Sequence, residues 1–205
     1  MADKQIKQLN EQTSINDSDK FPLQDGSTDE TKFTLLSTLR TKIRTGLEYE
    51  LLGRHLLSSS ADTLTLSGLT AKKYLKIYCY IVRSGNVGTV MRFNGDTGTT
   101  YAFRRSDDFG AATASTSQTS IPWETGTSTS DIFGIAEIVN FASGSKIGHM
   151  HTMQSGGATG ASAGANIERF IKWANTADQI TQITITNDET GDFLAGSELI
   201  VYGHD

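Results

Sequence analysis

The stretch Tyr-Leu-Lys-Ile-Tyr-Cys-Tyr-Ile-Val at residues 74–82 decides the fold. It is rich in aromatic and β-branched residues and contains no Gly or Pro, a composition that predicts a β-strand. Because side chains alternate across a strand, one face of it would be wholly apolar. That face would consist of Leu75, Ile77, Cys79 and Ile81. We therefore expect a central strand with other strands packed around it.

The composition suits a protein of short strands and turns. Its 205 residues are enough for one domain and an extension, and the net charge of −5 argues against non-specific nucleic-acid binding. The single cysteine, Cys79, cannot form an internal disulfide and is expected to be a small buried hydrophobe. We find neither a membrane-spanning apolar window nor an apolar signal region, so we expect the protein to stay in a cytoplasm until assembly or release.

The N-terminal part differs from the rest of the chain. Residues 1–31 are polar and acidic, and their sparse apolar residues predict an extended arm. Residues 35–43 predict one short helix, because four apolar residues fall on a single helical face. These are Leu35, Leu36, Leu39 and Ile43. A helix this short needs a partner surface. We therefore expect an arm with a helix over 1–47 and a separate β domain over 48–205.

From Tyr49 onward the pattern is β throughout. About ten strands are predicted, at residues 49–57, 63–66, 74–82, 87–93, 101–105, 132–141, 147–153, 167–173, 180–186 and 198–202. Two stretches rich in Ser, Thr, Gly and Ala, 106–131 and 155–166, are expected to be loops. Since no helical crossovers separate the strands, the sequence predicts a mainly β fold, an antiparallel, jelly-roll-like β-sandwich.

Three pieces of the arm carry a resemblance. They are Lys4-Gln-Ile6 with Leu9, Phe21-Pro22-Leu23-Gln24-Asp25, and Lys32-Phe-Thr34-Leu35-Leu36-Ser-Thr-Leu39. Together they resemble the N-terminal segment of tailed-bacteriophage minor structural and fibre proteins, which looks like an attachment module for a variable distal domain. The resemblance implies that the chain is anchored to other virion proteins of the capsid, portal, neck or baseplate. The implied anchoring residues are Ile6, Leu9, Phe21, Pro22, Leu23, Leu35, Leu36 and Leu39.

Residues 49–205 are also similar to β-sandwich domains of virion proteins in the same group. The residues that carry this similarity are Phe93–Gly98, Tyr101 with Arg104 and Arg105, Ile171–Asn175, Gly196–Leu199, and Gly203 with His204. Phage appendages of this kind are commonly trimeric, and a three-fold bundle would bury the apolar face of the expected helix. We therefore expect a homotrimer, with Tyr78 and Tyr80 as interface aromatics.

His149 and His151 form a candidate metal site. They are one residue apart in a predicted strand, so both imidazoles would lie on the same face. Two histidines are an incomplete site in a monomer, whereas a trimer axis would collect six ring nitrogens, an octahedral set. His-x-His pairs bind iron in this way in trimeric phage spikes and fibres, so the resemblance implies such a site. The alternative is a pair of surface or interface histidines, with no cofactor at all.

Two further kinds of site were weighed against simpler structural roles. The Asn- and Asp-rich stretches 94–98 and 187–192 could bind calcium, but turns that bond their own backbone are favoured. We do not expect an enzyme, because the sequence has no zinc-protease or phosphate-loop motif. Asp107 and Asp108 are adjacent, so on a strand they would point to opposite faces and make a poor glycosidase pair.

Two aromatic residues are candidates for contact with a receptor. Trp123 lies in the expected loop 106–131, and Tyr101 precedes it in a strand. Both could stack on the sugar rings of a host-surface glycan. The alternative is that Trp123 covers the core or a subunit contact.

The expected function is that of a structural virion protein of a tailed bacteriophage, a fibre or appendage subunit made in the host cytoplasm and located in the virion. Its arm would anchor a displayed β-sandwich. The alternatives are a receptor- or glycan-binding fibre tip and a capsid decoration protein. We expect neither nucleic acid nor a membrane as a partner.

Overall fold

The structure is a computed structural model that describes residues 20–24, 31–35, 49–124, 129–155 and 164–205. Contacts divide the chain into two units, Met1–Glu48 and Tyr49–Asp205. In the first unit, β1 (Lys20–Gln24) pairs with β2 (Thr31–Leu35) in an antiparallel hairpin. No helix among the described residues is long and apolar enough to span a membrane.

The helix expected over residues 35–43 is corrected at Leu35 alone, because residues 36–43 lie outside the described residues. Leu35 is the last residue of strand β2, opposite Lys20 of β1. The reason is local, because Thr31, Phe33 and Thr34 all favour a strand over a helix. Among the expected anchoring residues, Phe21, Pro22 and Leu23 lie in β1. Ile6, Leu9, Leu36 and Leu39 lie outside the described residues.

The second unit is all strand and loop among its described residues. Its strands are β3 (Glu50–Leu56), β4 (Thr63–Leu66), β5 (Tyr74–Ile81), β6 (Arg83–Ser84), β7 (Thr89–Phe93), β8 (Tyr101–Asp107), β9 (Thr113–Gln118), β10 (Ile121–Pro122), β11 (Ile132–Val139), β12 (Lys146–Gln154), β13 (Asn166–Trp173), β14 (Ile183–Asn187), β15 (Asp192–Phe193) and β16 (Glu198–His204). A strand occurs at each of the ten expected places, so the mainly β prediction is confirmed.

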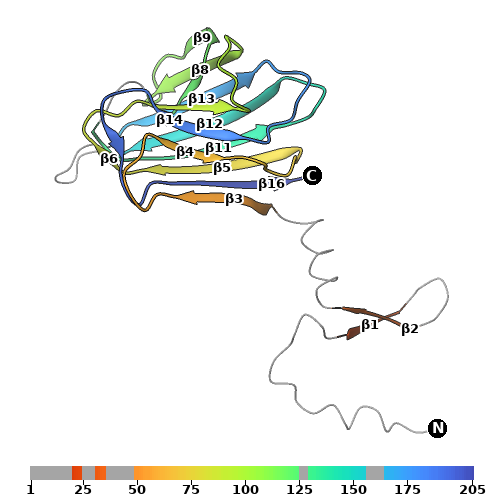
Figure 1. The fold of residues 1–205 in the computed structure, drawn as a ribbon. Coiled ribbons are helices and arrows are strands. Elements are labelled where there is room, and N and C mark those ends of the chain that lie inside the picture. The colour runs from red at the N-terminus through yellow and green to blue at the C-terminus, as the bar shows by residue number, and fades with distance from the viewer. Residues whose placement is uncertain (1–19, 25–30, 36–48, 125–128, 156–163) are drawn as a thin grey trace, which may run out of the picture. The chain divides into compact units, whose positions relative to one another are not determined.

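The strands form two larger antiparallel sheets (Figure 1). The first has eight strands in the order β3-β16-β5-β11-β12-β13-β8-β9, and the second has four in the order β10-β7-β14-β4. Strand β5 is a central strand, as predicted, and lies between β16 and β11. The short strands β15 and β6 pair separately.

Side chains from both sheets join in one hydrophobic core. The eight-stranded sheet contributes Leu75, Ile77, Cys79, Ile81, Ile132, Ala136, Ile138, Met150, Ile171, Trp173, Leu199 and Val201, and the four-stranded sheet contributes Leu64, Met91, Phe93, Ile121, Ile183 and Ile185. The face of β5 that the alternation predicted to be apolar is therefore buried. Burial also raises the pKa of the Cys79 thiol, which is consistent with an inert core residue.

The stretch 106–131, expected to be a loop, contains two strands that the sequence analysis missed. Strand β9 pairs with β8 and forms one edge of the eight-stranded sheet, and β10 pairs with β7. Strand β9 consists of Thr, Ala, Ser and Gln and is mostly exposed. It has no apolar alternation, because an edge strand with little buried surface does not need one.

The close approach of Trp123 to Gly134 provides a test of the packing between the sheets. A Cβ added to Gly134 would lie 2.3 Å from the Trp123 ring. Gly134→Ala should therefore lower the free energy of unfolding by roughly 1–3 kcal/mol, the usual cost of overpacking a core. Urea unfolding measures this change. Gly144→Ala is the matched control, since nothing lies within 4 Å of its added Cβ. Equal midpoints for the two variants would contradict the packing described.

Candidate functional site

The outer face of the eight-stranded sheet, the side opposite the core, carries large exposed apolar side chains. Phe170 is 65% exposed and Ile147 is 54% exposed. Exposed residues with them are Leu51, Leu56, Tyr74, Tyr80 and Met153. Contiguous apolar surface of this kind marks an interaction site, because a soluble monomer rarely exposes it without a use.

Strand register arranges this face in cross-strand rows. At one end of the strands, Leu56, Glu198, Tyr80, Phe133 and Met153 lie in one row. Two strand positions further along lies the row Arg54, Ile200, Tyr78, Ile135, His151 and Glu168. We call this part the tyrosine end and define it by Leu56, Tyr78, Tyr80, Phe133 and Met153. Side chains directly opposite each other in neighbouring strands are in contact range, so these rows form a continuous surface.

A groove of about 300 Å³ lies at the tyrosine end. It is lined by Tyr78, Tyr80, Phe133, Glu198, Ile200 and Tyr202. Tyr78 and Tyr202 meet edge to face with their ring centroids 6.0 Å apart. The carboxylate in this lining is paired, because Glu198 accepts a hydrogen bond from Arg54 Nε. The groove is therefore mainly an aromatic and aliphatic surface with its charge neutralised.

A larger groove of about 720 Å³ lies at the other end of the outer face, which we call the groove end. Tyr49 and Tyr74 line one side and residues 114–116 of β9 line the other. Between them lie Val139, Ile147, His149, Phe170 and Lys172. A concave, largely apolar surface with a few polar groups is the usual form of a small-ligand site.

The charges at the groove end are unevenly paired. Lys76 Nζ lies 2.8 Å from Glu137 Oε1, and this hydrogen bond raises the pKa of Lys76. Burial, and then the nearby charge of Glu137, raise the pKa of Tyr49, so its phenol stays protonated. The cations Arg104 and Lys172 make no ion pair with any described residue. They leave this groove with unneutralised positive charge beside aromatic rings.

His149 and His151 both lie on the outer face of β12, as the alternation predicted. The His149 ring is 5.4 Å from the Phe170 ring, and His151 Nε2 contacts Asn166 Oδ1. Among the described residues no three His, Cys, Asp or Glu side chains gather in metal-binding geometry within one chain. A metal held by the two histidines would need ligands from elsewhere, so the trimer-axis site stays a prediction.

The expected receptor contacts Tyr101 and Trp123 must be corrected. Tyr101 is 1% exposed and Trp123 is 0% exposed, so neither can stack on a sugar in this structure. Tyr101 packs against Trp173 with ring centroids 6.4 Å apart, and burial raises its pKa to about 12. Both residues belong to the core because Ile121-Pro122 forms a strand that carries Trp123 inward instead of leaving it in a surface loop.

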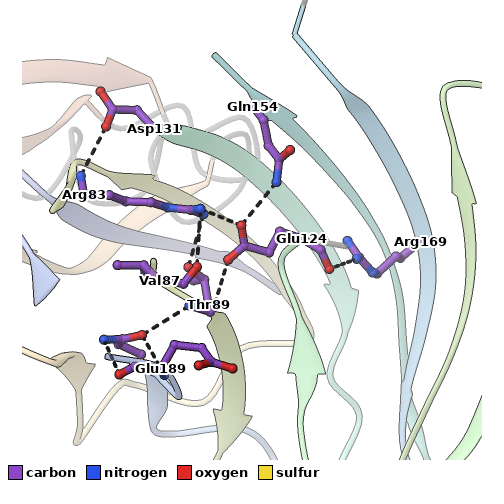
Figure 2. A network of polar contacts seen from close by, with 10 residues as sticks. Arg83, Val87, Thr89, Glu124, Asp131, Gln154, Arg169 and Glu189 are labelled. Atoms are coloured by element: carbon purple, nitrogen blue, oxygen red, sulfur yellow. Dashed lines mark hydrogen bonds and ion pairs between the residues drawn. The ribbon is translucent and has the colours of Figure 1, made fainter. Parts of the chain in front are cut away.

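A buried polar network around Glu124 was not predicted (Figure 2). Glu124 is 2% exposed, and its Oε2 lies 2.6 Å from Arg83 Nη1. Its Oε1 accepts a hydrogen bond of 2.8 Å from the Thr89 amide, and Oε2 accepts one of 3.2 Å from Gln154 Nε2. Burial raises the pKa of Glu124, and Arg83 opposes that rise. No sequence pattern indicates this pair, because Arg83 lies in the two-residue strand β6 and Glu124 lies 41 positions further along, just after β10.

The two Asn- and Asp-rich stretches serve as structural turns. Asn94 and Gly95 have φ values of 50° and 69°, and Asp96 Oδ1 accepts a hydrogen bond of 2.8 Å from the Gly98 amide. Asp96 Oδ2 accepts 2.7 Å bonds from Trp173 Nε1 and Thr100 Oγ1. In the second stretch, Asn187 Oδ1 accepts from the Glu189 amide at 3.0 Å. These oxygens are occupied by protein donors.

Comparison with protein-family models, with curated proteins and with solved structures finds no match to this chain. The chemistry of the outer face is therefore the strongest guide to function. Its aromatic and aliphatic side chains suit binding, as do Arg104 and Lys172, which make no ion pair within the described part of the chain.

Asp96 makes stability depend on pH in a direction that can be tested. Hydrogen bonds from Trp173, Thr100 and Gly98 lower the pKa of Asp96 in the folded state. Its contribution to stability is therefore complete above the unfolded-state pKa of about 3.9 and is lost as pH falls through the folded pKa. Asp96→Asn should be less stable than wild type near pH 7, by about 1–3 kcal/mol.

The difference in free energy of unfolding between wild type and Asp96→Asn should shrink as the pH is lowered. Protonation of Asp96 in wild type then weakens the same hydrogen bonds that the variant lacks. Urea unfolding of both proteins from neutral to acidic pH measures this difference. Asp178→Asn is the control, since the Asp178 carboxylate accepts a solvent-exposed hydrogen bond from Asn175 Nδ2. A difference in free energy of unfolding that stays constant with pH would show that the charge of Asp96 does not contribute to stability.

Proposed function

We propose that this chain is a structural virion protein of a tailed bacteriophage, a fibre or appendage subunit that is assembled in the host cytoplasm and located in the virion. The resemblance of residues 4–39 supports an anchoring role for the unit Met1–Glu48 on other virion proteins. The unit Tyr49–Asp205 would then be the displayed part. Two antiparallel sheets that share one core support the finer description of that unit as a jelly-roll-like β-sandwich.

The observation that carries the proposal is the apolar row at the tyrosine end. Leu56, Tyr80 and Met153 lie in one cross-strand row, and each is more than two-fifths exposed, at 49%, 42% and 45%. Burying apolar surface stabilises an assembly by roughly 25 cal/mol per Å². A second and third copy of the same face would supply apolar partners without a buried unpaired charge. We therefore propose a homotrimer that buries the tyrosine end.

A metal ion on the trimer axis is a subsidiary part of this proposal. His149 and His151 lie on β12, which has four strands on one side of it in the sheet and three on the other. A trimer that buried the middle of the outer face would bring three such pairs toward one axis. Imidazole nitrogens suit a transition metal, which would there link the three subunits.

The groove end supports a second candidate function, binding of a host-surface glycan by a fibre tip. Tyr74 and Phe170 offer aromatic faces for sugar rings, and Arg104 and Lys172 offer charge for an acidic group. This function can coexist with a trimer that buries the tyrosine end alone, whereas a metal on the trimer axis would bring His149, a residue of this groove, into the interface. A capsid decoration protein would use the same anchor and would differ in its copy number per particle.

The trimer can be tested at the tyrosine end. Replacing Tyr80 and Met153 together with Asp should turn the trimer into a monomer, because each subunit would bring two carboxylates into an apolar contact. Sedimentation velocity at micromolar concentrations measures the change. Phe170→Asp at the groove end is the matched control and should leave the trimer intact. A wild-type protein that sediments as a monomer would contradict the trimer and the metal site on its axis.

The anchoring role can be tested by deletion. A protein that lacks residues 1–48 should fold, because the core residues that the structure describes all lie within Tyr49–Asp205. It should no longer join the particle, since the proposed anchoring residues have been removed. Quantitative gels of purified particles measure incorporation and also give the copy number. Normal incorporation of the shortened protein would refute the role of residues 4–39 in attachment.

A further inference from the structure

Arg169 lies on the inner face of β13 and is 0% exposed. Its Nη2 donates a hydrogen bond to the backbone carbonyl of Glu124, as Figure 2 shows. Among the described residues, Nε and Nη1 have no hydrogen-bond partner. The guanidinium carbon lies 6.0 Å from the Phe103 ring centre. A buried charged group with two unused N–H donors is costly, so these donors require an acceptor.

Arg169 makes no ion pair with a carboxylate of the described residues, although the charges of Asp107 and Glu124 act on it. Arg105 lies directly opposite it in the β8–β13 ladder, a like-charge pair that is unfavourable at this spacing. The nearest carboxylates are already paired: Asp107 Oδ2 lies 3.2 Å from Arg105 Nη2, and Glu124 Oε2 lies 2.6 Å from Arg83 Nη1. Burial and the charge of Arg105 lower the pKa of Arg169 to about 9, so it remains a cation near neutral pH.

Two further donors in this region lack partners. Thr152 lies on the inner face of β12, diagonal to Arg169 across the β12–β13 ladder, and its buried Oγ1 has no partner among the described residues. The same is true of the indole Nε1 of Trp123, the residue before Glu124. Both Thr152 Oγ1 and the Trp123 ring lie close to Gly134. The unused groups that Arg169 and its neighbours offer are therefore mainly donors.

We propose that the inner face of the eight-stranded sheet holds a small inorganic anion of the halide class beside Arg169, with Nε, Nη1 and Thr152 Oγ1 as donors. The anion would supply the missing negative charge and would separate Arg169 from Arg105. It must be small, because Arg169 is wholly buried. The competing occupant is a water molecule that bridges Arg169 to Asp107 Oδ1, a buried acceptor that also has no partner among the described residues.

Thermal unfolding of the full chain in sodium chloride and in sodium gluconate, at equal ionic strength, separates an anion from water. Gluconate is too large for a buried site. Chloride at about ten times its Kd should raise Tm by roughly 3–6 °C. Thr152→Val should weaken this response and Arg169→Met should abolish it. Arg92→Met, on β7 of the four-stranded sheet, should respond like wild type.

Crystals of the wild-type full chain grown in sodium bromide provide the second measurement, which does not depend on any variant folding. An anomalous bromide peak within hydrogen-bond distance of Arg169 Nε or Nη1 is expected. Equal Tm values in chloride and gluconate, together with no peak at Arg169, would overturn the proposal in favour of a bridging water. A chloride response that survives in Arg169→Met would also overturn it, because the anion would then bind elsewhere.

Discussion

The ion pair between Arg83 and Glu124 is the polar contact on which the joining of the two sheets depends. Glu124 binds the Thr89 amide of the four-stranded sheet at 2.8 Å and Gln154 of the eight-stranded sheet at 3.2 Å, and its carbonyl accepts from Arg169. A buried pair adds little net stability by itself, but removal of one partner leaves an uncompensated charge that costs about 3–5 kcal/mol. This contact therefore links the two sheets next to Trp123, which the pairing of β10 with β7 carries into the core.

The eight-stranded sheet carries large apolar side chains on both of its faces. Its inner face is filled by the shared core, whereas its outer face keeps Phe170 and Ile147 more than half exposed. The exposed side chains of Phe170 and Ile147 do not stabilise the isolated chain. We therefore explain the outer face by a proposed contact with another molecule. The two ends differ in chemistry: the tyrosine end has its carboxylate paired by Arg54, while Arg104 and Lys172 at the groove end make no ion pair with a described residue. This difference is the basis for assigning subunit contact to one end and ligand contact to the other.

Most of the fold was predictable from sequence, whereas most of the candidate site was not. Strand β5 could be predicted because its alternation is strong, and β9 could not because an exposed edge strand needs no apolar pattern. Trp123 was misassigned because burial depends on the pairing of β10 with β7, a contact between residues about 30 positions apart. The outer face was foreseen only at Tyr78, Tyr80 and the two histidines, since the groove end forms only when β8, β9 and β13 come together.

Hydroxyl-radical footprinting of the assembled protein and of its dilute monomer tests the central claim, that the tyrosine end is buried between copies. The account predicts that Tyr80 and Met153 are labelled much less in the assembly than in the monomer. Phe109, which is 81% exposed and lies outside the strands of the sheet, should be labelled equally in both. Equal labelling of Tyr80 and Met153 in the two states would contradict the account, because the tyrosine end would then face solvent in the assembly.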